Sequence, residues 1–281
     1  MKLLKRKILF VLGSEIDFFL KSDGLEYKNY EFLYGRLLGF KPSSIRGSVL
    51  QLVKTGEVDK IIRNGTPLFR LTSQGRDRLL SFFPISIGQH KVWDGIWRIA
   101  LIKKQNDLSF LTDKKKIDNR RASYELRVLR RGLRSLGFKK LSRSIYITPL
   151  PISNQIKSFC LENQFFNAQI AVIESRRLII GDNKQIAKQI WGLDQLVSAY
   201  QVVITKIDRL LSGFKEEKGL KNREKKAFSL ILDLYFNLLE ADPGLPKKLL
   251  SSDWPADLVK ERFIKLALKV KQLEMGLDIV W

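Results

Sequence analysis

A group of polar side chains between residues 43 and 70 has the chemistry that binding to duplex DNA requires. Three small hydroxyl residues and one arginine stand close together: Ser43, Ser44, Arg46 and Ser48. Such groups can approach base edges in a major groove and hydrogen-bond to them. Three cations that could contact backbone phosphates follow along the chain: Lys60, Arg63 and Arg70. We take these seven residues as the candidate DNA-binding site.

The spacing of apolar residues places this site on a helix and a hairpin. Ile45, Val49, Leu52 and Val53 recur at helical intervals, so they face inward and leave the polar residues outside. Asn64-Gly65 then separates two short apolar runs, which is typical of a tight β-hairpin. The order of helix, hairpin and closing helix predicts a winged helix-turn-helix domain over residues 1–82. Winged helices also serve as protein-docking modules, and that alternative remains open.

The rest of the chain predicts two further domains and an α+β fold class. Residues 90–180 read as strand, helix, strand, strand, helix, strand, which is the ferredoxin-like βαββαβ order. Residues 181–281 carry two long amphipathic stripes, at 193–211 and 228–239, and we expect a helical C-terminal domain there.

Charge is concentrated in the central segment. The chain has 51 Lys and Arg against 29 Asp and Glu, a net charge of +22, and residues 81–150 alone carry 16 of the cations and 5 of the acids. Such a surplus favours a polyanionic partner. The first helix expected in the central domain places arginines on its outward positions, and we predict that they contact phosphate or an anionic ligand: Arg120, Arg127, Arg131 and Arg134.

Composition also excludes several classes of site. One cysteine and one histidine rule out internal disulfides, cysteine-rich zinc sites and clusters of histidine ligands, so we expect no metal and no cofactor. No apolar run is long enough to cross a bilayer, and we expect a cytoplasmic protein that does not bind membranes.

Two alternatives to a DNA-binding regulator remain at this point. A metal-dependent nuclease built on the central domain would need Asp94, Asp107 or Asp113 to hold a divalent cation. No convergence of carboxylates at strand ends is visible in the sequence, so we expect no catalytic residues. A non-catalytic RNA-binding protein would use the arginine-rich helix instead.

Several motifs resemble the PaaX-type repressors of phenylacetic acid catabolism, over nearly the whole chain. The more specific ones are Trp93-Asp-Gly-Ile-Trp-Arg and Asp242-Pro-Gly-Leu-Pro, the latter followed by Asp253-Trp-Pro. Phe69-Arg-Leu-Thr-Ser-Gln-Gly, Leu133-Arg-Ser-Leu-Gly-Phe and Tyr146-Ile-Thr-Pro add to the likeness.

The resemblance implies a winged helix on DNA, a central domain similar to the small ferredoxin-like protein of CRISPR spacer integration, and a helical C-terminal domain. It also implies a homodimeric repressor that an aryl-CoA thioester releases from DNA. Where the family commonly has an aspartate after the first central strand, this sequence has Ile102-Lys-Lys-Gln. This difference argues further against nuclease chemistry.

Overall fold

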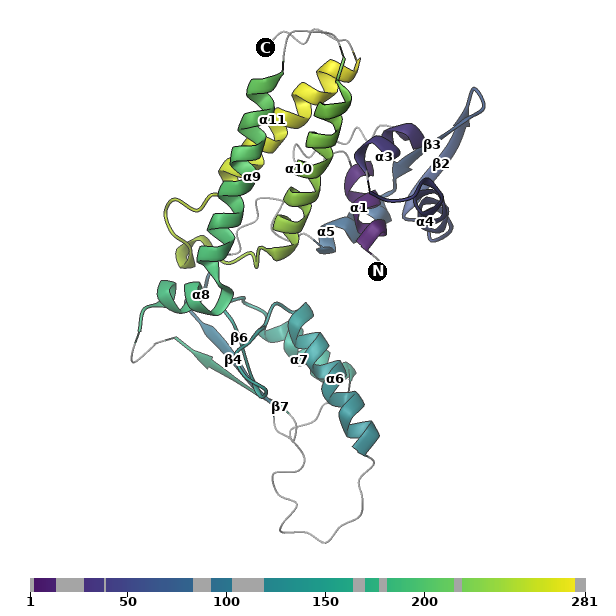
Figure 1. Ribbon diagram of the computed structural model, residues 1–281. Coiled ribbons are helices and arrows are strands. Elements are labelled where there is room, and N and C mark those ends of the chain that lie inside the picture. Colours follow the sequence, from purple (N-terminus) through teal and green to yellow (C-terminus); the bar gives the residue numbers. More distant parts are fainter. Residues whose placement is uncertain are drawn as a thin grey trace, which may run out of the picture. The chain divides into compact units, whose positions relative to one another are not determined.

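The computed structural model describes residues 3–13, 28–37, 39–82, 92–102, 119–163, 170–176, 181–214 and 219–275 (Figure 1). Helices are combined with two antiparallel sheets, which confirms the α+β class. The chain forms two compact units. Unit 1 comprises Met1–Gln89, Gln195–Asp242 and Trp254–Trp281, and unit 2 comprises His90–Asp194 and Pro243–Asp253.

Unit 1 contains a small sheet and two groups of helices. Its N-terminal part consists of α1 (Leu3–Leu12), β1 (Lys28–Asn29), α3 (Tyr30–Arg36), α4 (Pro42–Lys54), β2 (Val58–Arg63), β3 (Thr66–Leu71) and α5 (Ser73–Phe82). The strands pair in the order β1-β3-β2. Three long helices complete the unit: α9 (Leu193–Gly213), α10 (Asn222–Ala241) and α11 (Ala256–Met275).

The two parts of unit 1 share one hydrophobic core. Helix α1 is buried on every side over residues 8–12, so it needs apolar neighbours on both faces. Phe10 packs edge-on against Phe236 of α10 with ring centroids 5.7 Å apart. This grouping differs from the predicted division, in which residues 1–82 and 181–281 were separate domains, because the apolar stripe of α10 is buried against the N-terminal helices.

Unit 2 is built on a four-stranded antiparallel sheet. Its elements are β4 (Trp97–Ile102), α6 (Asn119–Ser135), β5 (Lys139–Lys140), β6 (Ile145–Thr148), α7 (Ser153–Glu162), β7 (Ile170–Ser175), α8 (Asn183–Trp191) and the 3₁₀ turn η2 (Lys247–Leu249). From β4 to β7 the element order is the predicted βαββαβ order, and the strands pair in the order β5-β6-β4-β7. Helices α6 and α7 cover one face of the sheet (Figure 1) and share a core with Ala100 and Tyr146.

The Trp93–Arg98 motif is explained by local structure in unit 2. Gly95 has a φ of +79°, and the Asp94 carboxylate accepts a hydrogen bond from the Ile96 N–H at 3.0 Å, which closes a tight turn into β4. Trp97 is buried, donates to Asn183 at 2.7 Å and stacks on Trp191 at 6.2 Å. The motif therefore anchors α8 to the sheet.

The Asp242 to Trp254 motif has a similar structural role. The buried Tyr200 hydroxyl donates a hydrogen bond to Asp242, and Trp254 packs edge-on against the same Tyr200 ring at 5.6 Å. Both ends of the motif thus meet at Tyr200 of α9, and Trp254 acts there as a packing anchor. Among the described residues, no helix is long and apolar enough to span a membrane.

Candidate nucleic-acid interface

Helix α4 presents the predicted polar face to solvent. Ile45, Val49 and Leu52 are buried, as the helical spacing predicted. Ser43, Ser44 and Arg46 are exposed, and Ser48 is half-buried at the flank. The helix starts at Pro42, whose missing N–H is not needed in the first turn, and it has no acidic residue there. The exposed start of α4 is therefore electropositive.

Arg46 is positioned by the first residue of α3, Tyr30. Its guanidinium carbon lies 5.8 Å from the centre of the Tyr30 ring, and Tyr30 in turn packs edge-on against the buried Phe69 at 4.6 Å. A cation over an aromatic ring is held by electrostatic attraction. This contact gives Arg46 a defined place beside the exposed face of α4.

Gly47 lies on the same exposed face, and the fold does not require glycine there. A Cβ atom built at this position would meet no atom within 4 Å. Glycine in a helix interior costs about 0.5–1 kcal/mol relative to alanine. Glycine at position 47 lowers stability and is not needed for packing. Its lack of a side chain is consistent with close approach of another molecule to this face.

Strands β2 and β3 form the predicted hairpin. Asn64 and Gly65 adopt φ angles of +50° and +72°, and the pairing runs from Arg63 opposite Thr66 down to Val58 opposite Leu71. Positive φ at both central residues is the conformation that an Asn-Gly hairpin turn requires. Because successive side chains alternate between the faces of a strand, Lys60 and Arg63 point to opposite faces of the hairpin.

The hairpin cations differ in their partners. Arg70 forms an ion pair with Asp59, its cross-strand neighbour, at 3.3 Å. Lys60 and Arg63 are exposed and have no carboxylate partner in the part of the chain that the structure describes. Of the three hairpin cations predicted to contact phosphate, these two therefore carry uncompensated charge. The Arg70 pairing could have been expected from the two-residue turn, because that turn sets residue 59 opposite residue 70.

Two further polar residues on α4 were not among the predicted site residues. Gln51 and Lys54 are exposed and lie one and two turns beyond Gly47 on the outer face. A glutamine amide can pair with an adenine edge, and a lysine can contact phosphate. The exposed apolar residues Leu50 and Ile62, 50% and 69% exposed, flank this surface on the helix and at the hairpin tip. Gln51 and Lys54 could have been identified from the helical phase of the buried residues, because that phase defines the outer face of α4.

The arginines of α6 form a second basic surface, in unit 2. Arg127, Arg131 and Arg134 are exposed at spacings of four and three residues, so they share one side of the helix. No carboxylate among the described residues pairs with any of the three. Arg120 also lies on α6, but its side chain is outside the described residues.

The carboxylates proposed for a nuclease are not gathered in the described structure. Asp94 binds Arg98 through both oxygens, at 2.6 and 3.2 Å, and this hydrogen bonding holds the pKa of Asp94 below its usual value. Asp107 and Asp113 lie outside the described residues. Within the described ranges, no cluster of three or more potential ligand residues of the His, Cys, Asp or Glu type is found.

The C-terminal part of the chain matches a known protein family. Residues 191–275 match the family described as PaaX-like protein C-terminal domain. The matched segment contains α9, α10 and α11, which pack with the N-terminal helices in unit 1.

A full-length relative extends the match. The transcriptional repressor PaaX of Escherichia coli (strain K12) is 24% identical over 277 residues, which cover 92% of this chain and 81% of that protein. Together the two matches confirm the predicted relation to the PaaX-type family. The solved structure of the uncharacterized protein Rv0674 from Mycobacterium tuberculosis is also similar, with a TM-score of 0.49 and 16% identity over 85% of each chain.

Proposed function

We propose that this protein is a DNA-binding transcriptional regulator of the repressor type. The observation that carries the proposal is the exposed polar face of α4 beside a hairpin with two uncompensated cations. The relation to a protein named as a transcriptional repressor supports regulation rather than catalysis.

In this proposal, residues 1–82 act as a winged helix-turn-helix. Helix α4 enters the major groove, where Ser43, Ser44, Arg46 and Gln51 approach base edges. The hairpin lies against the backbone, where Lys60 and Arg63 contact phosphates on its two sides. Phosphate contacts supply affinity for any duplex, whereas base contacts supply discrimination between sequences.

We further propose that unit 2 is ferredoxin-like and forms a homodimer through the sheet face opposite α6 and α7, beyond the end of that face where Trp97 packs on α8. Ile99 and Leu101 of β4 lie opposite Ile173 and Ala171 of β7 on the face that does not carry α6 and α7. Leu101 and Ile173 are 37% and 48% exposed, although both are apolar. Contiguous exposed apolar residues favour a protein interface.

A paired substitution tests the dimer. Ile173→Glu should convert the protein to a monomer in sedimentation-velocity experiments, because it would bury a charge in the interface. Leu161→Glu, at an exposed position of α7, is the matched control and should leave the dimer intact. A monomeric wild type, or equal effects of the two variants, would refute this interface.

A second candidate function is sequence-independent binding of nucleic acid by α6. It is favoured by the uncompensated charges of Arg127, Arg131 and Arg134. A variant with all three changed to glutamine should lose affinity for all duplexes alike. An aryl-CoA effector stays a prediction of the family resemblance.

Selection of bound sequences from a random duplex library tests the main proposal. The selection is made at about 150 mM salt, where nonspecific phosphate binding is weak. A regulator that binds as a dimer should recover an inverted repeat with half-sites about one helical turn apart. Recovery of no motif would contradict it and favour the α6 alternative.

A further inference from the structure

The arginines of α6 continue onto the neighbouring β5–β6 turn in unit 2. Arg130, which lies among these arginines on the helix, donates a hydrogen bond to the backbone oxygen of Arg143 in that turn at 3.5 Å. Lys140 of β5 lies opposite the buried Tyr146, so it is on the sheet face that α6 covers. Five exposed cations thus lie together, and we call them the α6 basic surface: Arg127, Arg131, Arg134, Lys140 and Arg143.

No acidic residue neutralises the α6 basic surface. Residues 126–161 contain eight Lys and Arg and no Asp or Glu. A helix C-terminus favours nearby cations, which accounts for Arg134 in the last turn of α6 but not for the other four. None of the five cations pairs with a carboxylate in the described ranges.

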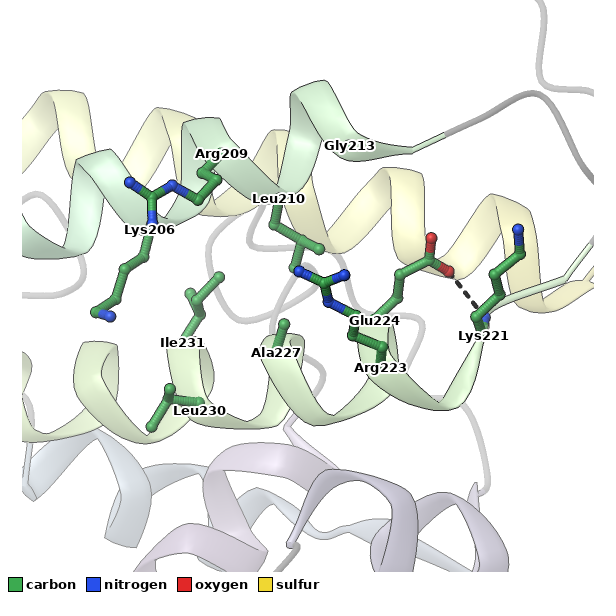
Figure 2. Close-up of a pocket in the computed structure, with 10 residues that line it drawn as sticks. All are labelled: Lys206, Arg209, Leu210, Gly213, Lys221, Arg223, Glu224, Ala227, Leu230 and Ile231. Carbon is green, nitrogen blue, oxygen red and sulfur yellow. Dashed lines mark hydrogen bonds between the residues drawn. The ribbon is translucent and has the colours of Figure 1, made fainter.

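Another group of cations in the chain has a different pattern. Lys206, Arg209 and Arg223 line a groove between α9 and α10 in unit 1, and Glu224 stands among them (Figure 2). The sequence from Lys206 to Glu224 has six cations and four acids. Interspersed charges of both signs are usual on a solvated surface, whereas cations alone attract a polyanion. The α6 basic surface therefore indicates a polyanionic partner.

An exposed aromatic side chain adjoins the α6 basic surface. Tyr124 of α6 is 61% exposed, and the Arg127 guanidinium carbon lies 5.9 Å from the centre of its ring. A single exposed apolar residue needs no explanation by itself. An aromatic ring beside phosphate-binding cations, however, is the combination with which proteins bind single strands. Unpaired bases can stack on such a ring, whereas the bases of a duplex are stacked on one another and cannot reach it.

We propose that the α6 basic surface and Tyr124 bind single-stranded DNA. The cations contact successive phosphates, and one unpaired base stacks on the Tyr124 ring. Neither contact depends on base identity, so the site tolerates any sequence. This inference goes beyond sequence-independent binding by α6, because Tyr124 makes the site prefer unpaired strands.

The choice of DNA over RNA rests on the proposed function. Unit 2 belongs to a chain that we propose to bind duplex DNA. The single strand at the highest effective concentration is then one that opens beside the bound duplex.

Fluorescence anisotropy of the full-length protein with a labelled oligothymidylate, which forms no duplex, tests the stacking. Tyr124→Ala should weaken binding of this strand about fivefold or more, the loss expected for one stacked base, and leave duplex affinity unchanged. Tyr124→Phe keeps an aromatic ring and should bind the strand like the wild type. Equal losses in the two variants, or an equal loss of duplex and single-strand affinity in Tyr124→Ala, would overturn stacking on this ring.

The salt dependence of single-strand binding tests the cations. Each phosphate contact that is lost reduces the slope of log affinity against log salt by about 0.7, so replacing Arg127, Arg131 and Arg134 with glutamine should reduce it by about 2.1. Lys184→Gln removes an exposed cation from α8, outside the α6 basic surface, and should leave the slope unchanged. An unchanged slope in the triple variant, or an equal reduction per residue in Lys184→Gln, would overturn the site.

Two further comparisons distinguish this site from the proposed function. Arg46→Ala combined with Arg63→Gln should weaken duplex binding and leave single-strand affinity unchanged, and loss of single-strand binding in that variant would overturn the assignment to unit 2. Oligouridylate should bind no more tightly than oligothymidylate, and tighter binding of the RNA would overturn the assignment to DNA. Absence of duplex binding in the wild type, with single-strand binding that depends on Tyr124, would instead refute the proposed function and leave the site.

Discussion

The salt dependence of DNA binding gives a quantitative test of the hairpin contacts. Each phosphate contact that is lost reduces the slope of log affinity against log salt by about 0.9. Lys60 and Arg63 carry charges without carboxylate partners, on opposite faces of the hairpin. Replacing both with glutamine should therefore reduce the slope by about 1.8. Between about 50 and 200 mM salt, the wild type should lose about 12-fold more affinity than the variant.

The matched control is Arg70→Gln. Arg70 lies on the same hairpin, but Asp59 already neutralises its charge at 3.3 Å. Substitution of Arg70 should therefore reduce the slope by clearly less than the value of about 0.9 for one phosphate contact. The assay is fluorescence anisotropy with a mixed-sequence duplex at four or more salt concentrations, with thermal unfolding as the check on folding. A slope that is unchanged in the double variant, or reduced equally by Arg70→Gln, would show that Lys60 and Arg63 do not supply the phosphate contacts.

Three further predictions concern single residues. Arg46→Ala should reduce discrimination between the selected duplex and a scrambled one by about 1–3 kcal/mol, measured by competition, whereas uniform loss on both duplexes would contradict base readout. Gly47→Ala should raise the free energy of unfolding by about 0.5–1 kcal/mol in urea and yet weaken DNA binding; stronger or equal binding would count against close approach at α4. Asp94→Asn should destabilise unit 2 by about 1–3 kcal/mol near neutral pH, because Arg98, whose side chain is 5% exposed, loses a charged partner.

The effect of Asp94→Asn on stability should also depend on pH. Because the pKa of Asp94 is lowered in the folded protein, its contribution to stability is fully present above the pKa of the unfolded chain. It is lost as the pH falls through the lowered folded-state pKa. The stability difference between wild type and Asp94→Asn should therefore shrink in acid. A difference that stays constant across that range would show that the Arg98 contact does not cause the effect.

Local structure could be predicted from the sequence where one short-range rule dominates. The phase of Ile45, Val49 and Leu52 correctly predicted which side of α4 is buried. Asn64-Gly65 correctly predicted the hairpin, because few other sequences adopt positive φ twice in succession. The order of strands and helices in residues 97–175 is the βαββαβ order that the sequence predicted.

Long-range packing could not be predicted in the same way. The apolar stripe of α10 is equally suited to an internal core or to a partner chain, and only the structure shows that it packs on α1. The sequence did not indicate that Arg98 is buried, because an arginine in a strand is usually exposed.

Site-specific photocrosslinking from α4 shows directly whether this helix lies on the DNA bases. In a Cys160→Ser background, a benzophenone label on a cysteine introduced at Gln51 should crosslink to the selected duplex, within its conserved half-site. The same label at Leu161, on exposed α7, serves as the control for random contact. Crosslinks from position 51 that require the selected sequence would support α4 as the element that reads DNA. Crosslinks from position 161 alone, or from both positions regardless of sequence, would contradict it.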